Sequence, residues 1–290
     1  MIASFQLTFY SKVHAYKNNA VIKEGDKVKI KEVEENVVTK AILKGSLEYL
    51  QNLTEADVAI VGAGPAGLTA SRYLAEAGLK TVVFERRLSF GGGIGGGGMQ
   101  LPMLVIQSPA DEILREIGCD LKIYKEDVYL VNSSEMLAKL AYSAVNAGAQ
   151  ILLGITVDDL IYRSTSEGAA GIVGVVVQWS SVIISGLHVD PLAFKAKAVV
   201  DCTGHDAEIL AVASRKIPEL DLMLPGEKAM WISESEKLIV EKTGEVCPGL
   251  YVAGMAVAAL YQTPRMGPIF GGMLLSGRKV AEIIKEKMGR

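Results

Sequence analysis

The feature that most constrains the fold of this chain is a glycine-rich turn, GAGPAG at residues 62–67, set between two regular segments. Residues 57–61 before it predict a buried parallel strand, and residues 66–77 after it have the apolar spacing of a helix. Gly62, Gly64 and Gly67 permit a tight turn whose backbone amides approach a pyrophosphate at the start of that helix. A second strand, at 79–84, ends at Glu85, whose carboxylate can accept hydrogen bonds from a ribose diol. The pattern predicts an α/β, Rossmann-like dinucleotide-binding fold, with a tight turn that binds no ligand as the alternative.

Composition narrows the class of protein further. Half of the 290 residues are hydrophobic, which is enough for a large core. The net charge is −3, and lysines and arginines form no stripe with aromatic residues between them, so we expect no nucleic-acid partner. Three cysteines without a CxxC pair fit a reducing, cytoplasmic setting better than a disulfide framework. Residues 168–187 carry no charge, but valine and isoleucine runs around a polar turn at 178–181 predict two strands there. We therefore expect a β-rich insertion and no membrane span.

The order of predicted segments indicates an N-terminal extension over residues 1–35 and a single dinucleotide-binding and catalytic domain over residues 36–290. The extension contains a predicted hairpin at about residues 20–30. The glycine-rich segment at 90–99 is too flexible to predict regular structure, and it either lets backbone approach a ligand or serves as a connector. The other predicted helices are 37–53, 111–117, 135–147 and 273–287, and the other strands are 122–131, 151–162, 197–201 and 249–253.

Two of the three histidines lie in short polar breaks beside acidic residues. His188 and Asp190 are two apart before Pro191, so in an extended segment they point to the same side. Asp190 and His205 could meet where two strands end, and an imidazole with a carboxylate is a partial shell for a divalent transition metal. Two ligands do not define a metal site. The alternative is that His205 and Asp206 cap the following helix while His188 is a hydrogen-bonded histidine at a strand end.

Seven strings in one consistent order resemble the thiamine thiazole synthase family, from about residue 37 to the C-terminus. They are DVAIVGAGPAGL, FERRLSFGGG, PADEIL, GLHVDPL, DCTGHDA, GLYVAGM and PRMGPIFGGM. The resemblance implies a glutathione-reductase-type dinucleotide-binding fold and a transferase of thiamine biosynthesis. It also implies that NAD is a substrate, which loses nicotinamide, is isomerised and condensed with glycine, and takes up sulfur to give an ADP-linked thiazole carboxylate. A homo-oligomer, an octamer in that family, is expected.

The resemblance assigns roles to residues by matching position. The adenosine and ribose part of the ligand would be lined by Ala66, Glu85, Arg86, Gly93 and Val157. The rest of the ligand would contact His188, Val189, Asp190 and Met255. Asp190 and His205 would bind ferrous iron, Fe(2+), from adjacent subunits. Arg265 would hold the glycine carboxylate, for which a guanidinium offers a bidentate fork.

The residue at position 188 selects the branch of the family. Eukaryotic-type members have a cysteine there and give up its sulfur in one turnover, whereas this chain resembles the archaeal-type members with histidine, which use free sulfide. The resemblance therefore implies a sulfide-dependent, multiple-turnover enzyme with His188, Asp190 and His205 as catalytic residues. A proton-carrying role for His188 is a hypothesis. The pairs at 94–95 and 100–101 depart from the family pattern, which leaves substrate packing in that loop open.

Three other functions remain as alternatives. A flavin-dependent oxidoreductase would share the fold and the first glycine motif, but such proteins commonly carry an aspartate where Met255 follows Gly254. A sugar-phosphate isomerase is suggested by the implied ketose-forming step, and a non-catalytic nucleotide-binding protein by the motif alone. A purified protein without the yellow colour of a flavin would argue against the first.

Overall fold

The computed structural model describes residues 30–164 and 170–290. Contacts divide the chain into two compact units, one ending at Tyr49 and one beginning at Leu50. Helix α2 (Glu35–Leu53) confirms the helix predicted at 37–53. The predicted domain boundary after residue 35 stays a prediction, and the predicted hairpin lies outside the described residues except for its last position. Within the described ranges, each helix is too short or too polar to traverse a bilayer.

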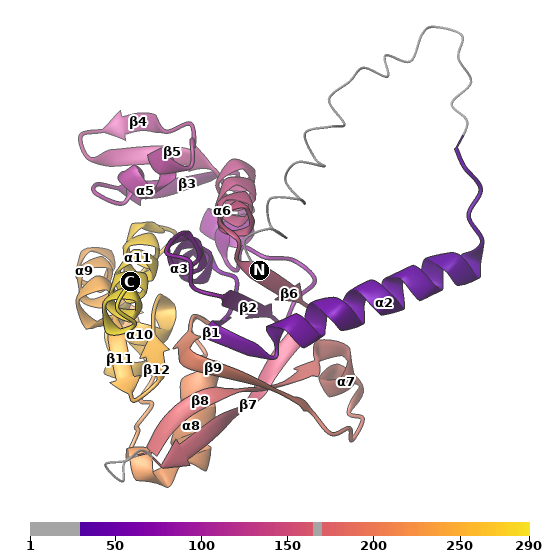
Figure 1. The fold of residues 1–290 in the computed structure, drawn as a ribbon. Helices are drawn as coiled ribbons and strands as arrows, with labels where there is room; N and C mark the ends of the chain where they lie inside the picture. The colour runs from indigo at the N-terminus through magenta and orange to yellow at the C-terminus, as the bar shows by residue number, and fades with distance from the viewer. Residues whose placement is uncertain (1–29, 165–169) are drawn as a thin grey trace, which may run out of the picture. The chain divides into compact units, whose positions relative to one another are not determined.

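The second unit is built on a mainly parallel sheet, which confirms the predicted fold class (Figure 1). Its path runs β11-β12-β9-β1-β2-β6, and only the edge strand β11 is antiparallel to its neighbour along this path. The strands are β1 (Glu55–Val61), β2 (Thr81–Glu85), β6 (Gln150–Leu153), β9 (Leu192–Asp201), β11 (Gly244–Cys247) and β12 (Leu250–Val252). Strand β2 is buried along its whole length, as expected of a parallel strand covered on both faces.

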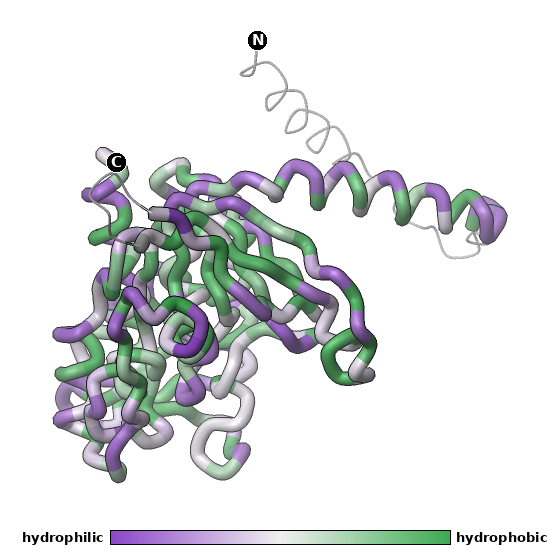
Figure 2. The backbone as a smooth tube through the Cα atoms, turned by 90° about the horizontal axis from the view of Figure 1, so that it is seen from below, coloured by the Kyte–Doolittle hydropathy of each residue, from purple (hydrophilic) through white to green (hydrophobic). Residues whose placement is uncertain are grey.

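Alternate residues of β1 divide the hydrophobic core into two. Val58 and Ile60 belong to one buried cluster, and Ala59 and Val61 to the other, because successive side chains of a strand point to opposite faces. The hydrophobic stretches accordingly gather in the strands of the sheet (Figure 2). The first cluster is covered by α3 (Pro65–Glu76), α6 (Ser133–Ala147) and α11 (Gly271–Lys287).

Helices α3 and α11 pack very closely at Gly277. A Cβ atom on this residue would lie 2.4 Å from the carbonyl oxygen of Ala66 and 3.0 Å from the Cβ of Thr69. No larger residue fits there without movement of one helix. Helix α11 confirms the helix predicted at 273–287. The absence of a side chain at Gly277 determines how closely α11 approaches α3.

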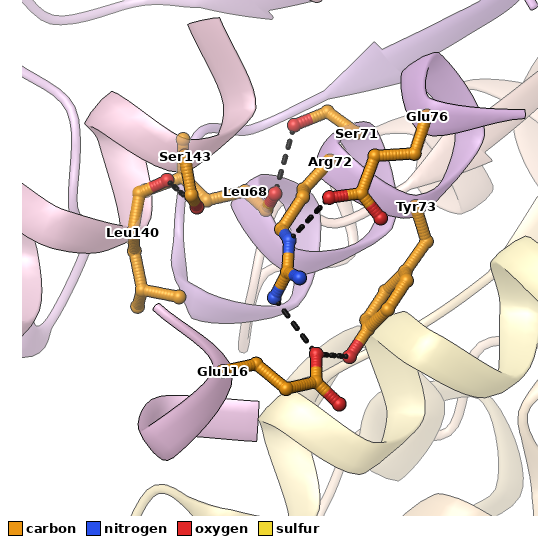
Figure 3. Close-up of polar contacts among 8 residues, drawn as sticks. All are labelled: Leu68, Ser71, Arg72, Tyr73, Glu76, Glu116, Leu140 and Ser143. Atoms are coloured by element: carbon orange, nitrogen blue, oxygen red, sulfur yellow. Dashed lines mark hydrogen bonds and ion pairs between the residues drawn. The ribbon is translucent and has the colours of Figure 1, made fainter. Parts of the chain in front are cut away.

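A polar cluster ties α3 to α5 (Asp111–Glu116), as Figure 3 shows. Arg72 binds Glu76 through Nε at 2.8 Å and Glu116 through Nη1 at 2.9 Å. The Tyr73 hydroxyl donates to the same Glu116 oxygen at 2.6 Å. The Arg72 guanidinium also lies 4.9 Å from the Tyr73 ring centre, which adds a cation–π contact.

A small antiparallel sheet precedes α6, and it corrects one prediction. The residues predicted as one strand at 122–131 form a hairpin of β4 (Lys122–Lys125) and β5 (Val128–Asn132), and β5 also pairs with β3 (Met103–Gln107). The chain reverses at Asp127, whose φ of 57° is a left-handed value that aspartate tolerates. Lys125, Glu126 and Asp127 are three consecutive charged residues at this turn, a break in the apolar pattern that the prediction of a single strand overlooked.

The predicted β-rich insertion is a long antiparallel ribbon of β7 (Ile155–Ser164) and β8 (Ala170–Trp179), and β8 pairs on with β9. The second strand expected at 182–184 is wrong, because these residues lie in helix α7 (Ser180–Ser185). The ladder ends with the pair Ile155 and Trp179, so no strand remains for residues 182–184 to pair with. Gly186 then ends the helix with a φ of 69°.

Several of the remaining elements border the carboxyl ends of the parallel strands. The glycine-rich segment at 90–99, predicted without regular structure, contains the short turns η1 (Ile94–Gly96) and α4 (Gly97–Gln100), the latter with left-handed values at Gly98 and Met99. Buried Ile94 anchors this segment to the core. The others are α8 (Glu208–Lys216), η2 (Pro218–Leu220), β10 (Lys228–Met230), α9 (Ile232–Lys242), α10 (Met255–Tyr261) and β13 (Pro264–Arg265).

Candidate functional site

A cavity of about 740 Å³ opens where the carboxyl ends of β1, β2 and β9 meet the glycine-rich segments. This is the edge at which open α/β sheets bind ligands. The predicted site residues that line it are Gly62, Gly64, Ala66, Glu85, Arg86, Gly93, Val157, His205, Met255 and Arg265. Gly67, His188, Val189 and Asp190 do not line it. The cavity therefore collects most of the residues predicted for nucleotide and glycine binding.

The three motif glycines serve two different purposes. A Cβ on Gly62 would lie 2.5 Å from the carbonyl oxygen of Cys202, and one on Gly67 would lie 2.0 Å from that of Gly62. Both glycines are thus required by packing within the protein. A Cβ on Gly64 would meet nothing nearer than the Cα of Gly92, at 4.0 Å, and Gly64 lines the cavity. Its backbone is open to a ligand at the start of α3, where unpaired amides favour phosphate.

Glu85 is held rigidly at the end of β2. Its side chain is buried, with 7% of the residue exposed, yet it lines the cavity. One carboxylate oxygen accepts from the backbone N–H of Ala63 at 2.9 Å, and the other accepts from that of Arg87 at 2.9 Å. An ionised carboxylate has about four acceptor positions, so two remain for ribose hydroxyls.

Glu227, an acidic residue outside every recognised sequence motif, joins His205 and Arg265. Glu227 Oε2 lies 2.7 Å from His205 Nδ1, and Glu227 Oε1 lies 3.8 Å from Arg265 Nε. The parallel pairing of β10 with β13, in which Lys228 lies opposite Pro264, places Glu227 near the start of the two-residue strand that contains Arg265. With Nδ1 of His205 occupied, Nε2 is the ring nitrogen free for a metal or a proton.

The turn that carries His205 is fixed by two side chains nearer the strand end. Asp201, fully buried, accepts from the backbone N–H of Leu210 at 2.9 Å, and Thr203 accepts from that of Glu208 at 2.7 Å. These bonds occupy the first amides of α8. The alternative that His205 and Asp206 cap this helix is therefore wrong, since Asp201 and Thr203 do so.

Asp190 and His205 lie at opposite ends of one strand. Asp190 is exposed two residues before β9 begins, and His205 follows four residues after β9 ends. Ten residues of strand span roughly 30 Å, so the expectation that the two side chains meet is wrong within a single chain. In the described ranges, 30–164 and 170–290, no three His, Cys, Asp or Glu side chains come together as a metal site.

None of the cysteines is a poised nucleophile. Cys202 lines the cavity, but burial raises its pKa well above the usual range for a thiol, and the nearby Asp201 charge adds to this. Burial raises the pKa of Cys119 and of Cys247 to about 11, with a nearby glutamate contributing in each case. Thiolate is the reactive form, so these side chains are packing residues.

The sheet, the glycine-rich turn and the cavity define an enzyme with a Rossmann-type fold. A family model described as the Thi4 family matches residues 39–270, and the chain belongs to that family. A thiamine thiazole synthase from Sulfolobus acidocaldarius is 57% identical over 262 residues, which cover 90% of this chain and 98% of that protein. One from Pyrobaculum calidifontis is 56% identical over 251 residues, covering 87% and 95%.

A solved structure agrees with these sequence matches. The crystal structure of Thermovibrio ammonificans THI4 is similar with a TM-score of 0.87 and 42% identity, and the match covers 90% of this chain and all of that one. The family resemblance and the fold class are confirmed. The matches favour thiazole biosynthesis over the flavin-dependent oxidoreductase and sugar-phosphate isomerase alternatives.

Proposed function

We propose that this chain makes an ADP-linked thiazole carboxylate from NAD, glycine and sulfide, in many turnovers and with ferrous iron. The observation that carries the proposal is a single cavity lined by the glycine-rich turn and Glu85 as well as by His205 and Arg265. A nucleotide and a small carboxylate can therefore be held side by side in one cavity. The close relatives named thiamine thiazole synthase support the class of reaction.

The cavity suits an adenine dinucleotide in size and in chemistry. Its volume of about 740 Å³ lies within the usual range of roughly 300–1,000 Å³ for small-molecule sites. The open backbone at Gly64 and the start of α3 would bind the pyrophosphate, and Glu85 would accept from the ribose. We propose Ala66, Gly93 and Val157 as further walls for the adenosine, and Met255 for the part of the ligand that reacts.

Arg265 is the proposed glycine-binding residue. Its guanidinium lines the cavity, and Glu227 orients it through Nε. The two terminal nitrogens, which form the fork that binds a carboxylate, take no part in that contact. Glycine held by its carboxylate would present its amino group to the sugar carbonyl, and the cavity would restrict both reactants to a productive geometry.

We propose His205 and Asp190 as iron ligands contributed by different subunits. The donor types suit ferrous iron, and a histidine whose Nδ1 is bonded to a carboxylate is the usual arrangement for a metal ligand at Nε2. Because β9 separates the two residues in one chain, a homo-oligomer must complete the site. When bound, the ion would orient sulfide and the glycine-derived reactant and stabilise negative charge.

Free sulfide is the proposed sulfur source, because position 188 is histidine and the three thiols are protonated at neutral pH. His188 lies with Val189 and Asp190 in an exposed segment, so it would reach a reacting ligand only in the neighbouring subunit's cavity. A proton-carrying role there is part of the proposal. His188→Ala would then lower turnover with sulfide while nucleotide binding is retained.

The test is anaerobic incubation of the purified protein with NAD, glycine, sulfide and ferrous iron, with mass spectrometry of both products and protein. We expect more than one adenylated thiazole per chain, and a protein mass that does not change. Product limited to one equivalent, with loss of a protein sulfur, would contradict the sulfide-dependent mechanism. Release of nicotinamide without any thiazole would instead support the isomerase-like alternative.

A further inference from the structure

Arg86 and Glu208 form an ion pair in the wall of the nucleotide cavity. Arg86 follows Glu85 directly after β2, and Glu208 is the first residue of α8. The Nη1 atom of Arg86 binds Oε1 of Glu208. Both side chains line the cavity, with exposed fractions of 44% and 29%. The pair therefore faces the space that a bound nucleotide would occupy, and it joins two segments distant in the sequence.

Carboxylates outnumber cations around this pair. Burial raises the pKa of Glu208, the charge on Arg86 opposes the shift, and the charges on Asp206, Asp201 and Glu85 add to it. Glu85 lies directly before Arg86 and lines the same cavity. Once Glu208 has neutralised Arg86, the charges that remain at the end of β2 are the carboxylate of Glu85 and the cation of Arg87.

The adenosine ribose of NAD carries a 2′-hydroxyl, and that of NADP carries a 2′-phosphate. A carboxylate at the end of the second strand accepts a hydrogen bond from the hydroxyl and repels the phosphate, whereas a nearby arginine accommodates the phosphate. This chain has both a carboxylate, Glu85, and an arginine, Arg86, at that point. The arginine alone would favour a 2′-phosphate, so the partner that occupies its charge decides the preference.

We infer that Glu208 is a specificity-determining residue. By holding and neutralising Arg86, it makes the cavity select an adenosine ribose with a free 2′-hydroxyl and reject one with a 2′-phosphate. The inference rests on the proposed function, because it takes an adenine dinucleotide as the ligand. It assigns Glu208 a role in choosing the substrate and no part in the reaction itself.

Arg87 is a second cation that could bind a 2′-phosphate, so the test must distinguish its effect from that of Arg86. Its side chain is exposed and lines the cavity, and no acidic partner pairs with its guanidinium within the described parts of the chain. Its backbone N–H is bound by Glu85, which fixes the main chain there. If Arg87 received a 2′-phosphate, removal of Glu208 would leave the preference unchanged, because Arg87 is not bound to Glu208.

The experiment compares ADP-ribose with ADP-ribose 2′-phosphate, two ligands that differ by one phosphate and carry no nicotinamide to react. Isothermal titration in the presence of EDTA gives both dissociation constants for the full chain after removal of copurified nucleotide. The variants are Glu208→Gln, the double variants that add Arg86→Gln or Arg87→Gln, and Glu76→Gln. The last removes a carboxylate paired with an arginine on α3 outside the cavity, and serves as the matched control.

We expect wild type and Glu76→Gln to bind ADP-ribose at least about 10-fold more tightly than its 2′-phosphate. Glu208→Gln should reduce this ratio by about 10-fold or more, mainly through tighter binding of the phosphate, and adding Arg86→Gln should restore it. A ratio unchanged in Glu208→Gln, or a gain abolished by Arg87→Gln and not by Arg86→Gln, would overturn the inference while leaving the nucleotide site intact. If wild type bound neither ligand, the proposed function would fail and the inference with it.

Discussion

Replacing Glu85 by glutamine tests whether one carboxylate both holds the cavity together and binds the ribose. The carboxylate accepts backbone N–H groups of Ala63 and Arg87, each at 2.9 Å. A glutamine keeps one acceptor oxygen and places an NH2 group against the other N–H, so one bond is lost and two donors face each other. A hydrogen bond to a charged group contributes roughly 1.5–3 kcal/mol, and the side chain is almost fully buried.

We therefore expect Glu85→Gln to lower the free energy of unfolding by about 2–3 kcal/mol in the absence of nucleotide. For a domain of this size that corresponds to a fall of roughly 4–12 °C in Tm. Equilibrium unfolding in denaturant, together with calorimetry, would measure both. ADP-ribose should also bind more weakly, because a hydroxyl that donates to a carboxylate would donate to a neutral amide.

The control is Glu76→Gln, which removes a carboxylate bound to Arg72 at the surface of α3 (Figure 3). The Glu76 side chain is 44% exposed, and the largely buried Arg72 keeps its second partner, Glu116, so the loss should be about 1 kcal/mol and this variant should remain close to wild type in Tm. Equal stabilities of the two variants would refute the argument, since they would mean that the amides of Ala63 and Arg87 do not depend on the Glu85 carboxylate.

Three further outcomes follow from the described contacts. Glu227→Gln should weaken binding of Co2+, a spectroscopic substitute for ferrous iron, by roughly 10–100-fold, and unchanged visible absorption titrations would contradict its positioning role. Gly277→Ala should lower the free energy of unfolding by about 1–2 kcal/mol because its Cβ collides with α3, whereas Gly45→Ala, with nothing within 4 Å, should cause no loss. The pKa values of Cys119 and Cys247 are raised to about 11, so little of either thiol is thiolate at pH 8. In the native protein both should react with iodoacetamide about 100-fold more slowly than a thiol of pKa 9.0, and peptide mapping can follow the rates.

The part of the fold around the glycine-rich turn could be predicted because local patterns determine it. An apolar run, a glycine turn, a helix and a strand ending in an acid follow one another without interruption, and the structure confirms β1, α3 and β2 in that order. Residues 182–184 show where such patterns fail. Valine and isoleucine favour strands, but a strand needs a neighbour to pair with. The first residue of β7, Ile155, already pairs with Trp179, so β7 has no residue left to pair with residues 182–184.

The residues of the candidate site likewise fall into those that local sequence patterns reveal and those that only the tertiary fold brings together. The residues of the glycine turn and Glu85 were recognisable from their spacing, and Arg265 from its chemistry and the family resemblance. Glu208 and Glu227 were not recognisable, because each is an acidic residue without a motif, and only the tertiary fold brings them to Arg86, or to His205 and Arg265. The pairing of β10 with β13 involves residues about 35 positions apart, a separation at which sequence periodicity carries no signal.

The length of β9 has a consequence for genetics. On the proposed iron site shared between subunits, the length of this strand makes Asp190 and His205 of one chain serve different cavities, so pairing an Asp190→Ala chain with a His205→Ala chain would bring both defects into one cavity. In a symmetric pair of such chains, one cavity has both defects and the other has none. Two inactive variants expressed together should thus complement each other and recover up to about a quarter of wild-type turnover, whereas either variant alone recovers nothing.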